Sequence, residues 1–113
     1  MKVYYYCHLF SDPHAEIRDA NLRRAMSRVM ALGKAEYGAG RVVWAPWIAL
    51  AAAGIAEERA WRIIAVCIAN SDGIIVDYDG KPASPGMLRE MELARGLDVV
   101  EVDKPGEARR KQT

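Results

Sequence analysis

Apolar residues gather in four short segments of the chain, separated by longer segments of mixed polarity. The four segments are residues 3–7, 41–45, 73–77 and 97–102. Nearly continuous apolar runs of this length are typical of parallel strands that are buried on both faces of a sheet. The pattern therefore predicts four strands in one parallel sheet.

Helical spacing characterises two of the intervening segments. Residues 14–33 carry apolar side chains three or four positions apart, with charged residues on the opposite face. Residues 57–70 begin with acidic residues and end near an asparagine, as amphipathic helices often do. Residues 47–53 are compatible with either a short helix or an apolar loop.

A last helix is predicted after the polar loop 78–83. Ser84 is a favourable N-cap, and Pro85 suits the first helical position. The apolar spacing continues to Arg95, and Gly96 is a natural residue to follow the helix end.

The order of these elements predicts an α/β domain. Strands alternate with helices, which implies right-handed crossovers and helices on both faces of the sheet. We expect a three-layer α/β/α fold with a four- to five-stranded parallel sheet, Rossmann- or flavodoxin-like. The domain spans residues 1–103, and residues 104–113 form a polar tail whose basic run, Arg109 to Lys111, is interpreted as a frayed terminus.

Composition narrows the function classes. The chain has 113 residues and a formal net charge of +1, which gives no reason to propose nucleic acid as a partner. Cys7 and Cys67 show no metal-ligand spacing and do not indicate a disulfide-stapled fold. No signal peptide is evident, and the longest apolar stretch, 44–56, contains Pro46 and Gly54 and is too short to span a membrane. We therefore expect a cytoplasmic protein that does not bind membranes.

Candidate chemistry lies where the strands end. The carboxyl ends of parallel strands share one edge of the sheet, which is where ligands bind in open α/β folds. That edge is predicted to collect residues from three strands and from the start of the last helix: Tyr6, Cys7, His8, Trp44, Ala45, Pro46, Trp47, Asp77, Tyr78, Asp79 and Ser84. Asp72 lies at the opposite end of its strand and is interpreted as structural.

Glu90 is the most informative carboxylate of the last helix. At 100° per residue it lies beside the stripe of Met87, Met91 and Ala94 that packs on the sheet, whereas Arg89 and Glu92 point away. A half-buried carboxylate has a raised pKa unless something donates a hydrogen bond to it. A tyrosine of residues 3–7 is a possible donor. The alternative is a surface acid that pairs with a nearby arginine.

Strand alternation separates the candidate tyrosines. Tyr4 and Tyr6 share one face of the predicted strand, and Tyr5 points to the other.

Other residues near the predicted edge also have structural explanations. Ser84 can cap its helix, or it can hold an anion or a sugar hydroxyl together with Gly86. His8 is a possible acid or base, although single histidines usually have other roles. Trp44 and Trp47 can stack on a base or pack in the core. The sequence contains no Walker loop, dinucleotide fingerprint, metal cluster or serine triad, so neither a metal nor another cofactor is expected.

A family resemblance adds to these observations. The segment Ser84 to Ala94 resembles the S-x-G-M-x-x-E-x-x-x-A signature of small bacterial and phage domains of unknown function in the nucleoside 2-deoxyribosyltransferase-like superfamily. Weaker similarities extend over residues 2–102. They include the opening strand, the helix around Asn21, the proline after the second strand and the strand that follows Asp72.

The resemblance implies an N-glycosidic reaction. In the enzymes of that superfamily, a glutamate at the position of Glu90 attacks the anomeric carbon, and a covalent glycosyl-enzyme forms. A tyrosine at the position of Tyr4 orients this nucleophile, and a serine or aspartate at the position of Ser84 lies near the sugar.

Two departures from the superfamily pattern concern the same site. Cys7, His8 and Leu9 replace small residues that admit the sugar or phosphate, and residues 61–70 lack the acid that assists base departure. We hypothesise that Asp77 or Asp79 substitutes for this acid.

The leading hypothesis is a nucleoside or nucleotide N-glycosidase or deoxyribosyltransferase. Its catalytic residues are Glu90, Tyr4 and Asp77, and its substrate-binding residues are Tyr6, His8, Trp44, Pro46, Asp79, Ser84 and Gly86. The alternatives are a nucleotide-binding or regulatory module that uses the same cleft without catalysis, and an interaction domain whose cleft is incidental. The resemblance also implies self-association into a dimer or a larger homo-oligomer.

Overall fold

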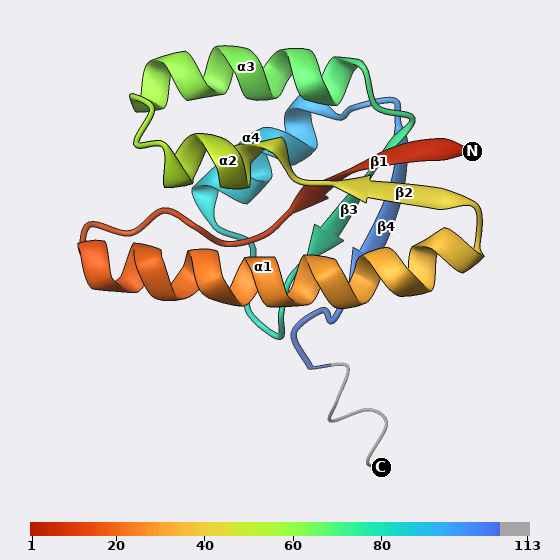
Figure 1. The fold of residues 1–113 in the computed structure, drawn as a ribbon, viewed down its shortest axis with the longest axis horizontal. Coiled ribbons are helices and arrows are strands. Elements are labelled where there is room, and N and C mark those ends of the chain that lie inside the picture. Colours follow the sequence, from red (N-terminus) through yellow and green to blue (C-terminus); the bar gives the residue numbers. More distant parts are fainter. Residues whose placement is uncertain (107–113) are drawn as a thin grey trace.

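A computed structural model of the protein describes residues 1–106, and the predicted basic run Arg109 to Lys111 lies outside the described residues. The described part forms the α/β fold that the sequence predicts (Figure 1). Its elements, in chain order, are β1 (Lys2–Cys7), α1 (Ala15–Gly38), β2 (Arg41–Trp44), α2 (Pro46–Ala52), α3 (Glu57–Ala69), β3 (Gly73–Asp77), α4 (Pro85–Leu93) and β4 (Asp98–Val102).

All strand pairs of the sheet are parallel, and the strand order is β2-β1-β3-β4. Figure 1 shows α1 on one side of the sheet and α2, α3 and α4 on the other, so the fold has three layers. The chain is therefore Rossmann- or flavodoxin-like. Because the strands are parallel, the loops that precede α1, α2 and α4 leave the sheet at the same edge.

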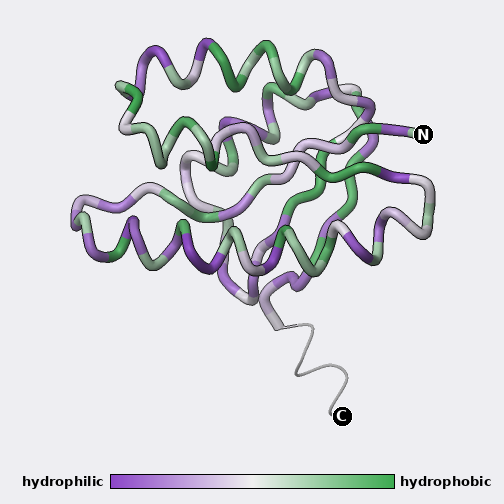
Figure 2. Tube along the Cα trace, viewed as in Figure 1, coloured by the Kyte–Doolittle hydropathy of each residue, from purple (hydrophilic) through white to green (hydrophobic). Residues whose placement is uncertain are grey.

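The core lies in the two central strands. Tyr5, Tyr6, Ile74, Ile75 and Val76 are almost completely shielded from solvent. Burial on both faces requires side chains that are apolar, or whose polar ends find partners inside the protein. Figure 2 shows the contrast with α1, along which hydrophilic and hydrophobic residues alternate because only one side of this helix faces the sheet.

Helix boundaries differ from the sequence prediction at two places. Helix α1 continues through Gly33 to Gly38, because a single glycine inside a helix costs only about 1 kcal/mol and strong helix formers follow it. It stops before Gly40, whose φ of +81° lies in the left-handed region that favours glycine. At the other end of the chain, α4 ends at Leu93, two residues before the predicted Arg95.

The amino-terminal ends of β1 and β3 are fixed by Asp72 and Gly73. The Asp72 carboxylate accepts a hydrogen bond of 2.7 Å from the backbone N–H of Val3, so Asp72 has the structural role that the sequence predicts. A Cβ atom on Gly73 would lie 2.4 Å from the Tyr4 ring and 2.8 Å from the Asp98 carbonyl oxygen. Only glycine therefore permits the close approach of these strands.

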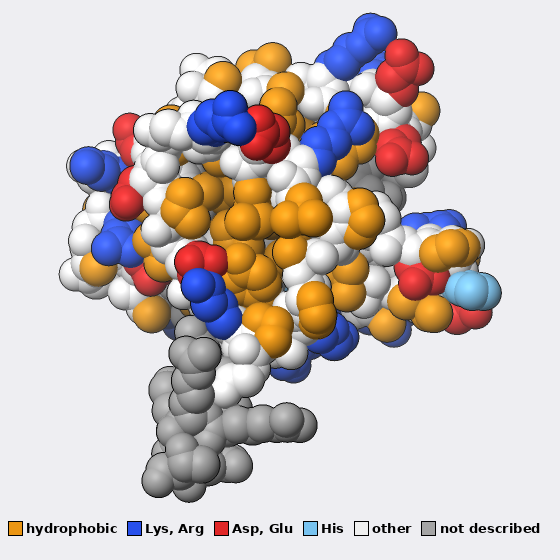
Figure 3. Space-filling view, turned by 180° about the vertical axis from the view of Figure 1, so that it is seen from behind, with side chains coloured by type: hydrophobic (Ala, Val, Ile, Leu, Met, Phe, Trp, Pro, Cys, Tyr) orange, Lys and Arg blue, Asp and Glu red, His pale blue; other side chains and the backbone are white. Residues whose placement is uncertain are grey.

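The surface at the β4 edge carries exposed apolar side chains. Figure 3 views this side of the molecule, and hydrophobic side chains gather in its centre. Leu88 and Leu93 of α4 and Val99 of β4 are each more than two-fifths exposed. No helix within residues 1–106 combines the length and the apolar character needed to cross a membrane.

Candidate active site

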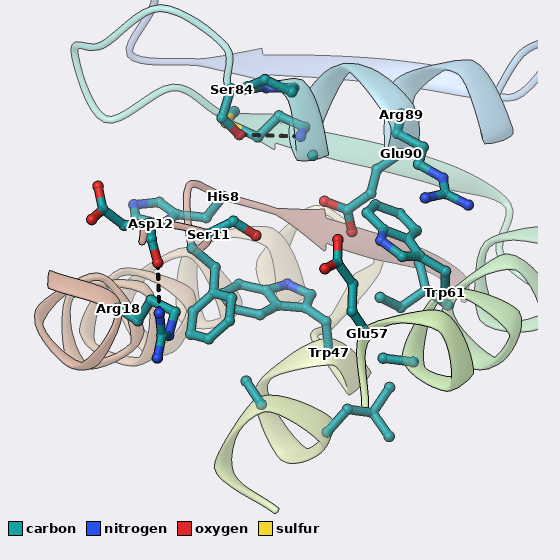
Figure 4. A pocket seen from close by; sticks show the side chains of 18 of the residues that line it. His8, Ser11, Asp12, Arg18, Trp47, Glu57, Trp61, Ser84, Arg89 and Glu90 are labelled. Carbon is teal, nitrogen blue, oxygen red and sulfur yellow. Dashed lines mark hydrogen bonds between the residues drawn. The ribbon is translucent and has the colours of Figure 1, made fainter. Parts of the chain in front are cut away.

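A cleft of about 680 Å³ opens at the carboxyl edge of the sheet. The loop after β1, the helix α2, the beginning of α3 and the first turns of α4 form its walls (Figure 4). Of the predicted site residues, His8, Ser84, Gly86 and Glu90 line this cleft. The cleft therefore lies at the sheet edge where the sequence analysis placed its candidate residues.

Glu90 lies in the wall of the cleft and is 6% exposed. Its carboxylate accepts a hydrogen bond from the hydroxyl of Tyr5. Burial raises the pKa of Glu90 to about 7, although the hydrogen bond from Tyr5 and the nearby Cys7 thiol oppose this shift. Among residues 1–106, no lysine, arginine or histidine forms an ion pair with Glu90, so the alternative of a surface acid paired with arginine is wrong.

The tyrosine that contacts Glu90 is Tyr5, whereas the resemblance assigned this role to Tyr4. Strand alternation turns Tyr5 toward α4 and turns Tyr4 and Tyr6 toward the opposite face. Tyr4 donates its hydroxyl hydrogen to Asp98 instead. Burial and the adjacent Glu90 carboxylate raise the pKa of Tyr5 far above its ordinary value of 10, so Tyr5 keeps its proton and acts as a donor.

Asp77 is also outside the cleft, contrary to its predicted catalytic role. Its carboxylate forms two hydrogen bonds with Arg28 of α1, at 2.6 and 2.7 Å, and accepts a third, of 2.6 Å, from Tyr6. Arg28 also pairs with Asp103 and with Asp79. Asp77 and Tyr6 are therefore structural residues that attach α1 to the sheet.

Asp79 belongs to the same ion-pair group. It pairs with Arg24 of α1 at 2.9 Å and contacts a ring nitrogen of His8 at 3.2 Å. Hydrogen bonds from Arg24 hold the pKa of Asp79 well below its ordinary value, so this carboxyl group has no proton to give to a leaving base. It does not line the cleft, and it cannot replace the missing helix acid.

The remaining predicted binding residues divide between the cleft and the core. Trp44 donates a hydrogen bond of 2.9 Å to Ser71, and Pro46 begins α2, and neither residue lines the cleft. Ser84 caps α4 by accepting a hydrogen bond of 3.2 Å from the backbone N–H of Met87. Its N-cap role is confirmed, and Ser84 lies at the cleft wall as well.

Three residues that the sequence interpretation left out of the site line the cleft next to Glu90. Glu57 and Trp61 come from the first two turns of α3, and Arg89 from α4 stacks its guanidinium over the Trp61 ring at 4.2 Å. In Figure 4 the carboxylates of Glu57 and Glu90 point toward one another. Residue 57 was recognised as an early helix acid, but its proximity to Glu90 depends on the packing of α3 against α4, which the sequence does not specify.

The far end of the cleft has a different character. Phe10 and Trp47 pack together with ring centroids 5.7 Å apart, and Trp47 is held by its hydrogen bond of 2.8 Å to the carbonyl oxygen of Tyr6. Beyond them, Arg18 donates a hydrogen bond of 2.7 Å to the backbone carbonyl of Asp12 (Figure 4). The cleft thus has two carboxylates and the Arg89 guanidinium at one end, aromatic rings in the middle, and Arg18 beside Asp12 at the other end.

This arrangement suits an organic ligand of modest size that carries a polar group at each end. Within residues 1–106, no group of three or more histidine, cysteine or acidic side chains is placed to hold a metal ion. Comparisons with protein-family models, with curated proteins and with solved structures find no match for this chain. Membership of the nucleoside 2-deoxyribosyltransferase-like superfamily stays a prediction that rests on the helix signature and on the position of Glu90.

Proposed function

We propose that the protein cleaves or transfers the N-glycosidic bond of a small nucleoside or nucleotide, with Glu90 as the nucleophile. The observation that carries this proposal is the Glu90 carboxylate, which is buried in the wall of the cleft and has a raised pKa. It accepts a hydrogen bond from the Tyr5 hydroxyl, and no cationic side chain among residues 1–106 pairs with it. Burying an unpaired carboxylate opposes folding, and such groups cluster at functional sites.

In the first step, an oxygen of the ionised Glu90 carboxylate forms a bond to C1′ of the sugar. The bond between C1′ and the base nitrogen breaks, and its electron pair leaves with the base. A glycosyl ester of Glu90 results. In the second step, water or a second base attacks C1′, and the electron pair of the ester C–O bond returns to Glu90.

Tyr5 positions the nucleophile in this scheme. Its hydroxyl is fixed in the core of the sheet, and its hydrogen bond stabilises the ionised form of Glu90, which is the reactive form. Trp47 and Phe10 provide apolar surface for a ring, and Ser84 and Gly86 border the region next to the nucleophile.

A base-release assay tests the proposal. The protein is incubated with ribo- and deoxyribonucleosides and their 5′-monophosphates, with and without an acceptor base, and free bases are separated by chromatography. We expect release or exchange that falls by about 10⁴-fold or more in Glu90→Gln, as is usual when a nucleophile is removed. Glu92→Gln is the matched control, because Glu92 is exposed on the same helix and pairs with Arg95. Full activity in Glu90→Gln contradicts the mechanism.

A nucleotide-binding module without catalysis is the second candidate. The surroundings of His8 favour this candidate. His8 is 5% exposed, and its two ring nitrogens contact the Leu9 carbonyl oxygen at 2.8 Å and the Asp79 carboxylate, so neither nitrogen is directed at a substrate. Saturable binding of a nucleotide without turnover by any substrate supports this candidate. Self-association also stays a proposal, which light scattering after size-exclusion chromatography tests.

A further inference from the structure

Apart from Glu90, which is the nucleophile, the described cleft is poor in groups that can protonate a leaving base. His8 directs both ring nitrogens at oxygen acceptors of the protein. The backbone N–H of His14 donates to Asp12 at 2.9 Å, and this bond is the main reason why the pKa of Asp12 is lowered. Neutral purines and pyrimidines are poor leaving groups unless an acid protonates them. The described cleft residues therefore favour a substrate that needs no such acid.

The other acidic residue of the cleft, Glu57, has surroundings that suit an anion. It is exposed and lies in the first turn of α3, where the helix dipole stabilises negative charge. Its carboxylate points toward that of Glu90 (Figure 4). Two carboxylates that face the same space attract a cationic group of the ligand.

The aromatic walls provide a second attraction for a cation. The Arg89 guanidinium already lies over the Trp61 ring at 4.2 Å, which shows that this ring can hold a positive charge at the cleft mouth. Trp47 and Phe10 continue the aromatic surface into the cleft. Glu57 and Glu90 outnumber Arg89 at this end of the cleft, whereas Arg18 lies beside Asp12 at the opposite end, so positive charge on a ligand is favoured beside Glu57.

We propose that the preferred substrate carries a positively charged N-linked heterocycle, such as a pyridinium or an N7-alkylated purine, which binds between Trp61, Trp47 and Glu57. The proposal rests on the proposed N-glycosidic function and names its substrate class. When the C1′–N bond of such a substrate breaks, the electron pair neutralises the ring. The base then departs as a neutral molecule without any proton, and the glycosyl ester of Glu90 is resolved by water, whose proton passes to solvent.

Binding of the charged ring is measured first, with ligands that have no glycosidic bond. The 1-methylnicotinamide cation and neutral nicotinamide differ by one methyl group and one charge, and calorimetry gives their Kd values for the unmodified protein. We expect the cation to bind about tenfold more tightly, which is within the usual range for a partly desolvated cation–aromatic contact. Glu57→Gln should remove most of this preference, whereas the control Glu92→Gln should keep it.

Turnover is then compared between charged and neutral substrates, each as nucleoside and 5′-monophosphate. The pairs are N-ribosylnicotinamide with inosine and 7-methylguanosine with guanosine, and each rate is divided by the uncatalysed rate under the same conditions. A larger acceleration for the charged member supports the inference. Equal binding of the two nicotinamides overturns it, even if neutral nucleosides are hydrolysed and the proposed function stands. Preferential binding of the cation without turnover of any substrate supports the ligand class and overturns the catalytic function.

Discussion

Two neighbouring tyrosines of β1 hold two buried carboxylates in opposite ways. On the α1 side of the sheet, Asp77 receives the Tyr6 hydroxyl and the two-pronged guanidinium of Arg28, so its charge is neutralised. On the α4 side, Glu90 receives the Tyr5 hydroxyl, and no cation among the described residues pairs with it. Both residues are shielded from water, since Asp77 is 0% exposed and Glu90 is 6% exposed.

The difference separates a structural carboxylate from a candidate functional one. An ion pair with several hydrogen bonds fixes a helix to the sheet, and its members have no capacity left for a ligand. A buried carboxylate without a counter-ion costs stability and remains available to react or to bind. The predictions below test whether the two sites differ in this way.

The largest effect on stability is expected on the Asp77 side. Asp77→Asn leaves Arg28 without its main partner, and breaking a buried pair costs about 3 kcal/mol or more. Glu90→Gln strands no cation and should cost less than about 1 kcal/mol, because it also removes a buried charge. Urea unfolding monitored by circular dichroism compares both variants with the unmodified protein. Equal destabilisation by the two substitutions would remove the distinction between the sites.

The pH dependence of stability should identify Glu90. Its pKa is about 7 in the folded protein and ordinarily 4.5, so between these values the folded state binds more protons than the unfolded state. The contribution of Glu90 to stability is therefore greatest below about pH 4.5 and is lost as the pH rises through 7. Relative to Glu90→Gln, the unmodified protein should lose about 3 kcal/mol between pH 4 and pH 8. A pH-independent difference between the two proteins would contradict the raised pKa.

Tyr5 should set the pH at which Glu90 becomes active. The hydrogen bond from Tyr5 lowers the pKa of Glu90, so Tyr5→Phe should shift the rising limb of the activity profile upward by about one pH unit. About tenfold less base release is then expected near neutral pH, with recovery at higher pH. Tyr4→Phe is the matched control, because Tyr4 bonds to Asp98 on the opposite face. The same shift in both variants would rule out a specific role of Tyr5.

The smallest effect is expected at the start of α4. Ser84→Ala removes the hydrogen bond to the backbone N–H of Met87 and should lower the unfolding free energy by about 1 kcal/mol. Turnover should change by no more than a few-fold if the cap is the main role of Ser84. A large loss of turnover with little loss of stability would instead place the hydroxyl on the substrate.

The sequence predicted the fold because its periodic features are local. Continuous apolar strands, the cap at Ser84 and the spacing around Glu90 depend on neighbouring residues, and each agrees with the structure. The sequence analysis assigned Asp77 to the catalytic residues because the residue pattern of α1 does not indicate that Arg28 reaches the end of β3 and pairs with Asp77. The role of Tyr5 was missed because alternation separates two faces without stating which face α4 covers.

The run Tyr4-Tyr5-Tyr6 has a consequence for how β1 can vary over evolution. Each of the three hydroxyls donates to a different acid, namely Asp98, Glu90 and Asp77. Inserting or deleting one residue at the start of the strand would turn every hydroxyl to the wrong face and leave three acids without donors at once. Point substitutions remove one of these bonds at a time. We therefore expect homologues of this chain to differ in the identity of residues within β1 far more readily than in its length.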